Sequence, residues 1–267
     1  MLGFYFLYLI CRQYFKSPWG YLITFLAVDF NENLVFHAFE IRPYGGLVTL
    51  ALGAFLVTRR VVERKGPSLA EKTGYTLFLS LTLLFHFYGC LILFFPYLFH
   101  LLVTRQDESP GSVLARNIKD YGLGMAVAAA VWGFFVFGYD KSYLIIYGTF
   151  NFIPKGLMPV TKAIVGNLIG FKPFYFLLAG FLAWPFVPKR ERWAQAMFFL
   201  VMVAAPVGAV LLLCVVTNYY FVQRLFIWVM PFFALLLGWQ WDALIYHLGE
   251  RRKAAPAEEM AAGVSVR

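Results

Sequence analysis

Long uncharged stretches alternate with short charged ones along this chain of 267 residues. In residues 194–217, for example, 24 consecutive positions carry no Asp, Glu, Lys or Arg. About 20 apolar residues in a helix are enough to cross the hydrocarbon core of a bilayer, so this pattern predicts a series of membrane-spanning helices. The apolar segments are 1–11, 18–36, 43–58, 73–104, 121–138, 173–187, 194–217 and 225–246.

The segment 73–104 is too long for one ordinary span. Its 32 residues would form a helix of about 48 Å at a rise of about 1.5 Å per residue, whereas the hydrocarbon core is about 30 Å thick. We therefore predict a tight hairpin at residues 86–89. The result is an all-α, polytopic membrane protein with about nine transmembrane helices.

The chain divides into a transmembrane domain and a tail. Residues 1–248 form the helical domain, with an outer loop at 139–172, and residues 249–267 mix Arg, Lys, Glu, Ala and Pro. A segment with so few large apolar side chains cannot bury a core. The sequence therefore predicts a disordered cytoplasmic tail.

The positions of Lys and Arg predict the orientation of these spans. If segments 12–17, 59–72, 105–120 and 188–193 and the tail share one side, that side holds 17 of the 23 Lys and Arg. Short loops rich in Lys and Arg stay in the cytoplasm, so the carboxyl terminus is expected there, in a multi-pass protein of a bacterial inner or plasma membrane. The remaining six, expected outside, are Arg42, Lys141, Lys155, Lys162, Lys172 and Arg224.

Composition excludes a water-soluble enzyme. The chain is 61% hydrophobic and only 14% charged, while soluble domains hold about 25% charged residues. A formal net charge of +9 would suggest nucleic acid in a soluble protein, but here it follows the predicted cytoplasmic loops, so we expect membrane lipid and no nucleic acid as a partner. The three cysteines lie in apolar stretches without the spacing of a disulfide framework or a zinc site, which indicates packing.

The densest polar cluster lies at a predicted outer helix end. It begins at Asp29 and continues through His37, Glu40 and Arg42. On a helix, His37 and Glu40 would share a face because they are three residues apart. Ionisable groups close to the membrane suggest a functional site, although a solvated loop would carry the same residues.

The sequence HAFEIRPY at residues 37–44 resembles the S-x-E-x-R-P-Y segment of the polytopic GT-C glycosyltransferases, the protein mannosyltransferase-like group. Two further stretches are similar to that family. Residues 84–89, with His86 and Tyr88, resemble its hairpin tip rich in His and Tyr, and residues 220–231 resemble its late R-Y-x-x-x-x-x-P span. The resemblance extends over residues 7–243 and is weak between 105 and 215.

This resemblance implies transfer of a sugar from a polyprenyl-phosphate donor to an acceptor on the extracytoplasmic side of the membrane. Such a reaction needs a carboxylate to accept the proton of the acceptor hydroxyl and positive charge to stabilise the leaving phosphate. Glu40, at the predicted outer membrane surface, is the candidate for this catalytic carboxylate, and Asp29 and Glu32 are alternatives. The expected substrate-binding residues are His37, Arg42, Tyr44, His86, Tyr88, Tyr219, Tyr220 and Arg224.

The chain departs from the family in one respect, since no acidic outer loop precedes Glu40. We therefore expect the carboxyl-terminal part of such an enzyme, or a chain to which a partner supplies the acidic loop. A non-catalytic GT-C-like membrane subunit or remnant is the alternative, and a transporter of a lipid-linked precursor is a third reading. No cofactor is predicted, but His37, Glu40 and His86 are residue types that could hold a divalent metal.

Structural roles compete with these functional ones. Glu40 and Arg42 could form an ion pair at a helix end. Arg224 could anchor its helix by extending its charged group to the lipid headgroups, and the tyrosines could belong to an interfacial belt.

Overall fold

The computed structural model describes eight parts of the chain, and their regular secondary structure is helical throughout. The prediction of an all-α protein is therefore confirmed for these residues. The described residues are 2–31, 34–35, 44–63, 66–85, 109–138, 180, 190–217 and 227–264. The helices are α1 (Leu2–Tyr14), α2 (Pro18–Asp29), α4 (Tyr44–Glu63), α5 (Leu69–Phe85), α7 (Pro110–Gly138), α11 (Arg190–Thr217) and α12 (Met230–Val264), the last preceded by a 3₁₀ turn at 227–229.

Local sequence signals explain where several helices begin. Helix α5 starts with a capping box, in which the Ser68 backbone N–H donates to Glu71 Oε2 at 2.9 Å and the Glu71 N–H donates to Ser68 Oγ at 3.3 Å. These two bonds satisfy amide donors that the first turn of a helix leaves free. Helix α2 begins at Pro18, whose fixed φ suits a first helical position.

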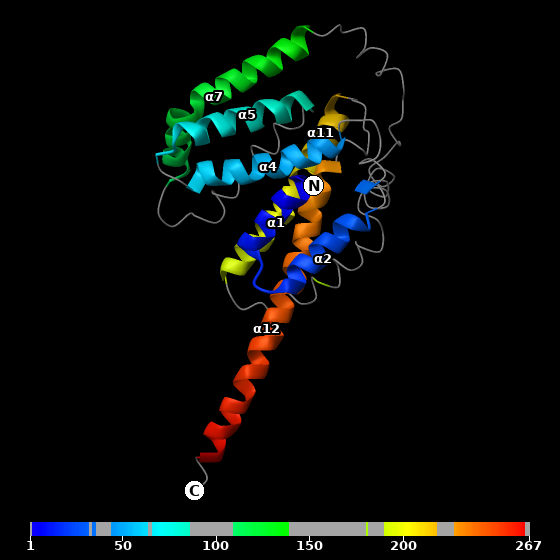
Figure 1. The fold of residues 1–267 in the computed structure, drawn as a ribbon, viewed down its shortest axis with the longest axis vertical. Coiled ribbons are helices and arrows are strands. Elements are labelled where there is room, and N and C mark those ends of the chain that lie inside the picture. Colours follow the sequence, from blue (N-terminus) through cyan, green and yellow to red (C-terminus); the bar gives the residue numbers. More distant parts are fainter. Residues whose placement is uncertain are drawn as a thin grey trace.

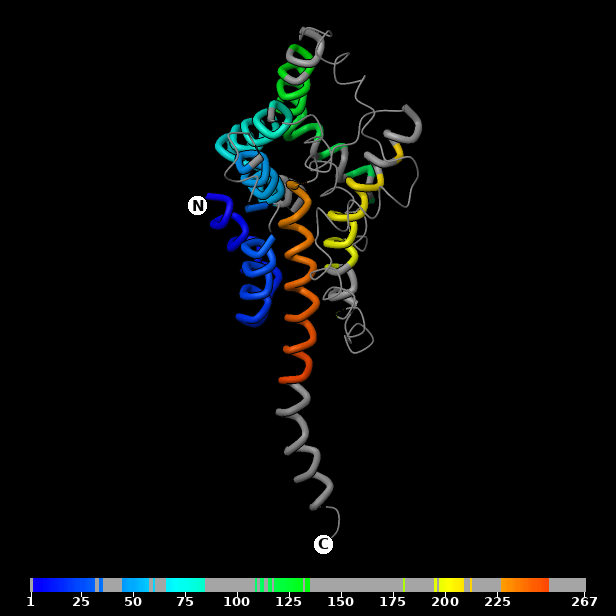
Figure 2. Tube along the Cα trace, turned by 90° about the vertical axis from the view of Figure 1, so that its right-hand side faces the viewer, coloured from blue at the N-terminus to red at the C-terminus, as the bar shows by residue number. Residues whose placement is uncertain are grey.

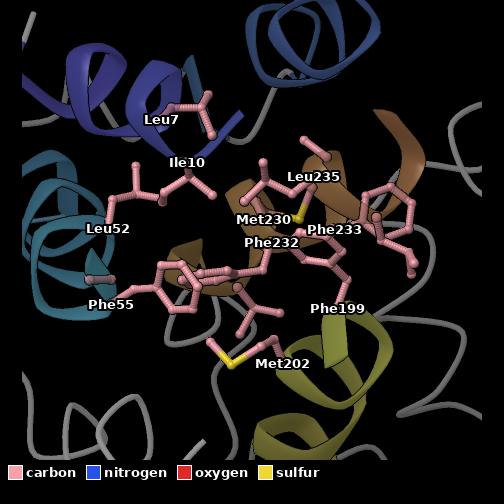
Figure 3. Close-up of a cluster of buried hydrophobic side chains, with 14 of the residues drawn as sticks. Leu7, Ile10, Leu52, Phe55, Phe199, Met202, Met230, Phe232, Phe233 and Leu235 are labelled. Carbon is pink, nitrogen blue, oxygen red and sulfur yellow. The ribbon is translucent and has the colours of Figure 1, made fainter. Parts of the chain in front are cut away.

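Helix α12 forms the centre of the main core. Every residue from 227 to 240 is buried, and Figure 2 shows α12 between α1 and α2 on one side and α11 on the other. A helix that is apolar all round must be surrounded by other apolar groups. The side chains shown together in Figure 3 are Leu7 and Ile10 of α1, Leu52 and Phe55 of α4, Phe199 and Met202 of α11, and Met230, Phe232, Phe233 and Leu235 of α12.

A smaller apolar cluster joins α5 to α7. The rings of Tyr75 and Tyr121 meet edge to face with centroids 5.0 Å apart, and Leu79 and Ala128 complete the buried group. The free thiol of Cys11 is buried in the main core, as its apolar neighbours in the sequence predict.

Contacts along the helices fix their relative directions. Gly3 lies beside Thr49 and Gly53 lies beside Phe6, so α1 and α4 run in the same direction. Helix α2 is antiparallel to α12, because Ser17 bonds to Asp242 and Thr24 to the Ala234 carbonyl.

Helix α11 is also antiparallel to α12. Its early residue Gln195 bonds to Trp239, and the ring of Phe198 packs on Phe55, which also meets Phe232. In Figure 1, the ends of α1 and α4 and the starts of α5 and α11 lie toward the lower left, and their opposite ends lie toward the upper right. These directions agree with the alternation of spans that the charge pattern predicts.

One described helix, Ile227–Gly249, is long and apolar enough to cross a membrane, and Gly45–Val57 and Met197–Gly208 are shorter apolar helices. The core helix of a soluble protein meets the same criterion, since it too is apolar on every face. This finding is therefore weak support for membrane association, and the nine spans stay a prediction. Large apolar side chains exposed on α1 and α2 also support membrane association. They include Leu2, Tyr5, Tyr8, Trp19, Leu22 and Leu26.

Two boundaries differ from those expected. Helix α2 ends at Asp29, not at residue 36. Helix α12 continues to Val264, past residue 249, where the predicted tail begins. Ala, Glu, Arg and Lys have high helix propensity, and extending an existing buried helix avoids the cost of a new nucleus. Helix α5 ends at Phe85, directly before the predicted hairpin at 86–89, which lies outside the described residues.

Candidate functional site

Almost all of the predicted site lies outside the described residues. Tyr44 begins α4, but its side chain is not described. The predicted residues outside the described ranges are His37, Glu40, Arg42, His86, Tyr88, Tyr219, Tyr220 and Arg224. The suggested metal ligands are among them, and the described residues contain no group of three His, Cys, Asp or Glu side chains that could hold a metal ion.

The helix ends that flank these residues lie at one end of the bundle. In the antiparallel pair α2 and α12, Ser17 is level with Asp242 and Thr24 with Ala234. The same register places the end of α2 level with the 3₁₀ turn that begins at Ile227. The segments 37–44 and 220–226 therefore join the described bundle at the same end.

Two more helix ends belong to this group. Helices α1 and α4 are parallel, so the start of α4 lies beside the start of α1, where Phe4 stacks on Phe25 near the end of α2 with ring centroids 5.9 Å apart. Helices α4 and α5 are antiparallel neighbours, with Gly53 against Phe78, and this brings Phe85 level with the start of α4. All three motif-bearing segments thus connect to one end of the bundle.

Asn31 shapes the chain at this end. Its side chain is buried, and its Oδ1 accepts a hydrogen bond of 2.8 Å from the Leu34 N–H. The Asn31 N–H itself donates to the Val28 carbonyl at 3.2 Å. These bonds close α2 and start a new turn at residues 34–35. An Asn side chain is well suited to this role because it can bond to nearby backbone groups.

At the opposite end of α2, a buried carboxylate from α12 caps the helix. Asp242 accepts hydrogen bonds from the backbone N–H of Lys16 at 3.0 Å and of Ser17 at 2.7 Å, and from Ser17 Oγ at 2.5 Å. Ser17 is the N-cap residue of α2 but makes no side-chain cap bond of its own. Because the N-terminus of a helix carries free donors and partial positive charge, the carboxylate is well placed there.

Small residues allow α2 and α12 to approach closely. Gly20 and Thr24 of α2 face Ala234 and Gly238 of α12, with four-residue spacing on both helices. A Cβ atom on Gly238 would lie 2.6 Å from the Gly20 carbonyl oxygen and would also clash with Thr24 Oγ1. The Thr24 hydroxyl donates to the Ala234 carbonyl at 3.3 Å. Such small-residue crossings are typical of helix pairs in membranes.

Further polar side chains of α12 reach other neighbours at the same level as Asp242. Trp239 Nε1 donates to Gln195 Oε1 of α11 at 3.1 Å. Gln240 is buried and lies against Gly180. These residues were not predicted, although an Asp and a Gln inside the apolar segment 225–246 are a usable signal. Since their described bonds join helices, we assign them to holding the bundle together rather than to chemistry.

Comparisons with models of protein families, with curated proteins and with solved structures returned no match. The function of this chain must therefore be inferred from its residues and from how the helices arrange them. The likeness to GT-C glycosyltransferases stays a prediction.

Proposed function

We propose that this chain is a multi-pass membrane glycosyltransferase of the GT-C type, or the carboxyl-terminal part of one. It transfers a sugar from a polyprenyl-phosphate donor to an acceptor on the extracytoplasmic side. The observation that carries the proposal is the shared position of the helix ends around the three motif segments. The end of α2, the start of α4, the end of α5 and the start of α12 lie together, as a site made from these segments requires.

The proposed membrane arrangement has about nine spans, with the motif-bearing end outside and the carboxyl terminus in the cytoplasm. The directions of α1, α2, α4, α11 and α12 support it, because each agrees with the side that the Lys and Arg pattern assigns to its ends. The apolar exterior of α1 and α2 supports contact with lipid.

The proposed chemistry needs two kinds of group. The acceptor oxygen attacks the anomeric carbon of the sugar while Glu40 accepts the hydroxyl proton, so that the new bond forms from a deprotonated oxygen. The bond between the anomeric carbon and the phosphate oxygen breaks, and polyprenyl phosphate leaves with the electron pair. Arg42 and Arg224 stabilise the negative charge of that phosphate through their planar guanidinium donors.

Replacing Glu40 by Gln should lower sugar transfer by at least about 100-fold, because general-base catalysis typically contributes that much or more. The assay measures release of polyprenyl phosphate from a panel of polyprenyl-phosphate sugars by membranes that contain the protein. Glu71→Gln is the matched control, because Glu71 belongs to the α5 capping box at the opposite end and should keep full activity. Equal activity of the Glu40 variant and the wild type would reject this role, and an inactive wild type would favour a non-catalytic subunit.

Replacing Arg224 by Ala should raise the KM for the donor by roughly 10- to 100-fold, because hydrogen bonds to charged groups contribute about 1.5–3 kcal/mol. Donor titrations of both proteins measure this change. Arg116→Ala, in the first part of α7, is the control and should leave KM unaltered. If the Arg224 variant has the kinetics of the wild type, Arg224 is an interfacial anchor.

A further inference from the structure

Three exposed basic side chains, Arg12, Lys16 and Arg60, lie at the end of the bundle opposite the proposed site, and we call them the basic rim. Arg12 lies in the last turn of α1, Lys16 follows that helix, and Arg60 lies in the last turn of α4. Since α1 and α4 are parallel, their last turns point to the same end. The rim therefore gathers positive charge from two segments of the chain, residues 12–16 and residue 60.

Neighbouring helix ends add to this charge. Helix α11 is antiparallel to α12, so its start at Arg190 lies level with the residues just after Asp242. Helix α12 then leaves the bundle and passes through Arg251, Arg252 and Lys253 (Figure 1). Acidic residues on the same helix ends are Glu63, Glu71, Glu191, Glu250, Glu258 and Glu259. Glu71 is engaged by Ser68.

The nearest buried acid leaves the charge of Lys16 available. The Asp242 carboxylate accepts a hydrogen bond from the backbone N–H of Lys16. Among the described residues it forms no ion pair with the Lys16 ammonium group. The ammonium nitrogen lies over the ring of Tyr246, 5.1 Å from its centroid. An aromatic face attracts a cation without neutralising it. Lys16 thus lies along α12 and presents its charge close to where that helix leaves the bundle.

An exposed aromatic side chain marks the same level. Trp19, in the first turn of α2, is exposed and follows Lys16 by three positions. Trp is enriched at the boundary between hydrocarbon and headgroups, where its apolar ring and polar N–H are both satisfied. If Trp19 lies at this boundary, the basic rim at the same end of the bundle lies at the depth of the lipid headgroups.

We propose that the basic rim binds anionic phospholipid headgroups. This inference rests on the membrane arrangement in the proposed function, which puts the rim on the cytoplasmic side. The leaflet on that side carries anionic lipids, and each Lys or Arg near its surface adds to the attraction. Lysine and arginine can keep their alkyl stems on apolar helix surface while their charges meet phosphate groups.

The test uses the full chain purified in non-ionic detergent and titrated with dioleoylphosphatidylglycerol or dioleoylphosphatidylcholine, with bound lipid counted by native mass spectrometry. We expect preferential binding of the phosphatidylglycerol. The variant R12Q/K16Q/R60Q should bind it at least about tenfold more weakly. The matched control K155Q/K162Q/K172Q removes the same charge from the predicted outer loop and should keep the wild-type affinity.

Equal binding of the two lipids, or an equal loss in the two triple variants, would overturn the proposal. Circular dichroism and thermal melting establish that each variant is folded. If the rim variant is not, the single variants R12Q, K16Q and R60Q replace it, because each removes one exposed charge, and unchanged affinity in all three would equally overturn the proposal. Lipid binding is measured independently of sugar transfer. If the protein has no transferase activity but still binds phosphatidylglycerol preferentially, the proposed enzymatic function is rejected and the proposed lipid binding by the basic rim stands.

Discussion

Replacing Gly238 by Val should destabilise the helix bundle by about 3 kcal/mol, at the upper end of the usual cost of overpacking. The reason is geometric, because a Cβ atom at this position would lie 2.6 Å from the carbonyl oxygen of Gly20. A backbone oxygen in a helix cannot rotate away as a long side chain can. Helices α2 and α12 would have to separate, and this would also weaken the bond between Thr24 and the Ala234 carbonyl.

The apparent melting temperature in detergent, measured at one fixed heating rate, reports this loss. For a protein of this size, about 3 kcal/mol corresponds to a decrease of roughly 6–12 °C. Gly208→Ala is the matched control, because Gly208 lies inside α11 and a Cβ there meets nothing within 4 Å. It should be neutral or stabilising by up to about 1 kcal/mol through helix propensity. A Gly238→Val protein that melts like the wild type would show that α2 and α12 do not cross at this position.

Replacing Asp242 by Ala should cost a similar amount, about 3 kcal/mol, because it removes three part-buried hydrogen bonds that contribute about 1 kcal/mol each. The carboxylate accepts the N–H groups of Lys16 and Ser17 and the Ser17 hydroxyl. Without it the turn between α1 and α2 loses its attachment to α12. Melting temperature measures the global effect, and amide hydrogen exchange at residues 16 and 17 measures the local one.

Graded variants separate this cap from a general loss of packing. Ser17→Ala removes only the hydroxyl bond and should cost about 1 kcal/mol. Asp242→Asn keeps one oxygen acceptor, so its loss of stability should lie between those of Ser17→Ala and Asp242→Ala. Lys16→Gln keeps the backbone N–H that Asp242 binds and should retain the protection of that amide. Rapid exchange at residues 16 and 17 in the wild type would contradict the cap.

The helices themselves were largely predictable from the pattern of apolar and charged residues. The segments 43–58 and 194–217 correspond to α4 and α11. The split of 73–104 stays a prediction, because residues 86–89 lie outside the described ranges. Helix ends were less predictable, because they depend on local bonds such as those of Asn31.

The polar residues of α12 show why the sequence could not give the contacts of the bundle. An Asp and a Gln in an apolar segment signal importance, but nothing in the sequence indicates that Asp242 serves the backbone of residues 16 and 17. Those partners are more than 220 positions away in the chain. Similarly, Gly238 is one of 22 glycines, and only the crossing with Gly20 distinguishes it.

By itself the sequence predicted an all-helical protein, which the described residues confirm, because long apolar segments placed in a membrane must satisfy their backbone groups within each segment. It also determined which helix ends are basic, since charge depends only on residue identity. The tertiary structure decided which helices pair and at what height, because close packing depends on shapes that meet only when distant segments come together. It brought Asp242 to the start of α2 and brought the ends that flank residues 37–44, 86–89 and 220–226 to one side of the bundle.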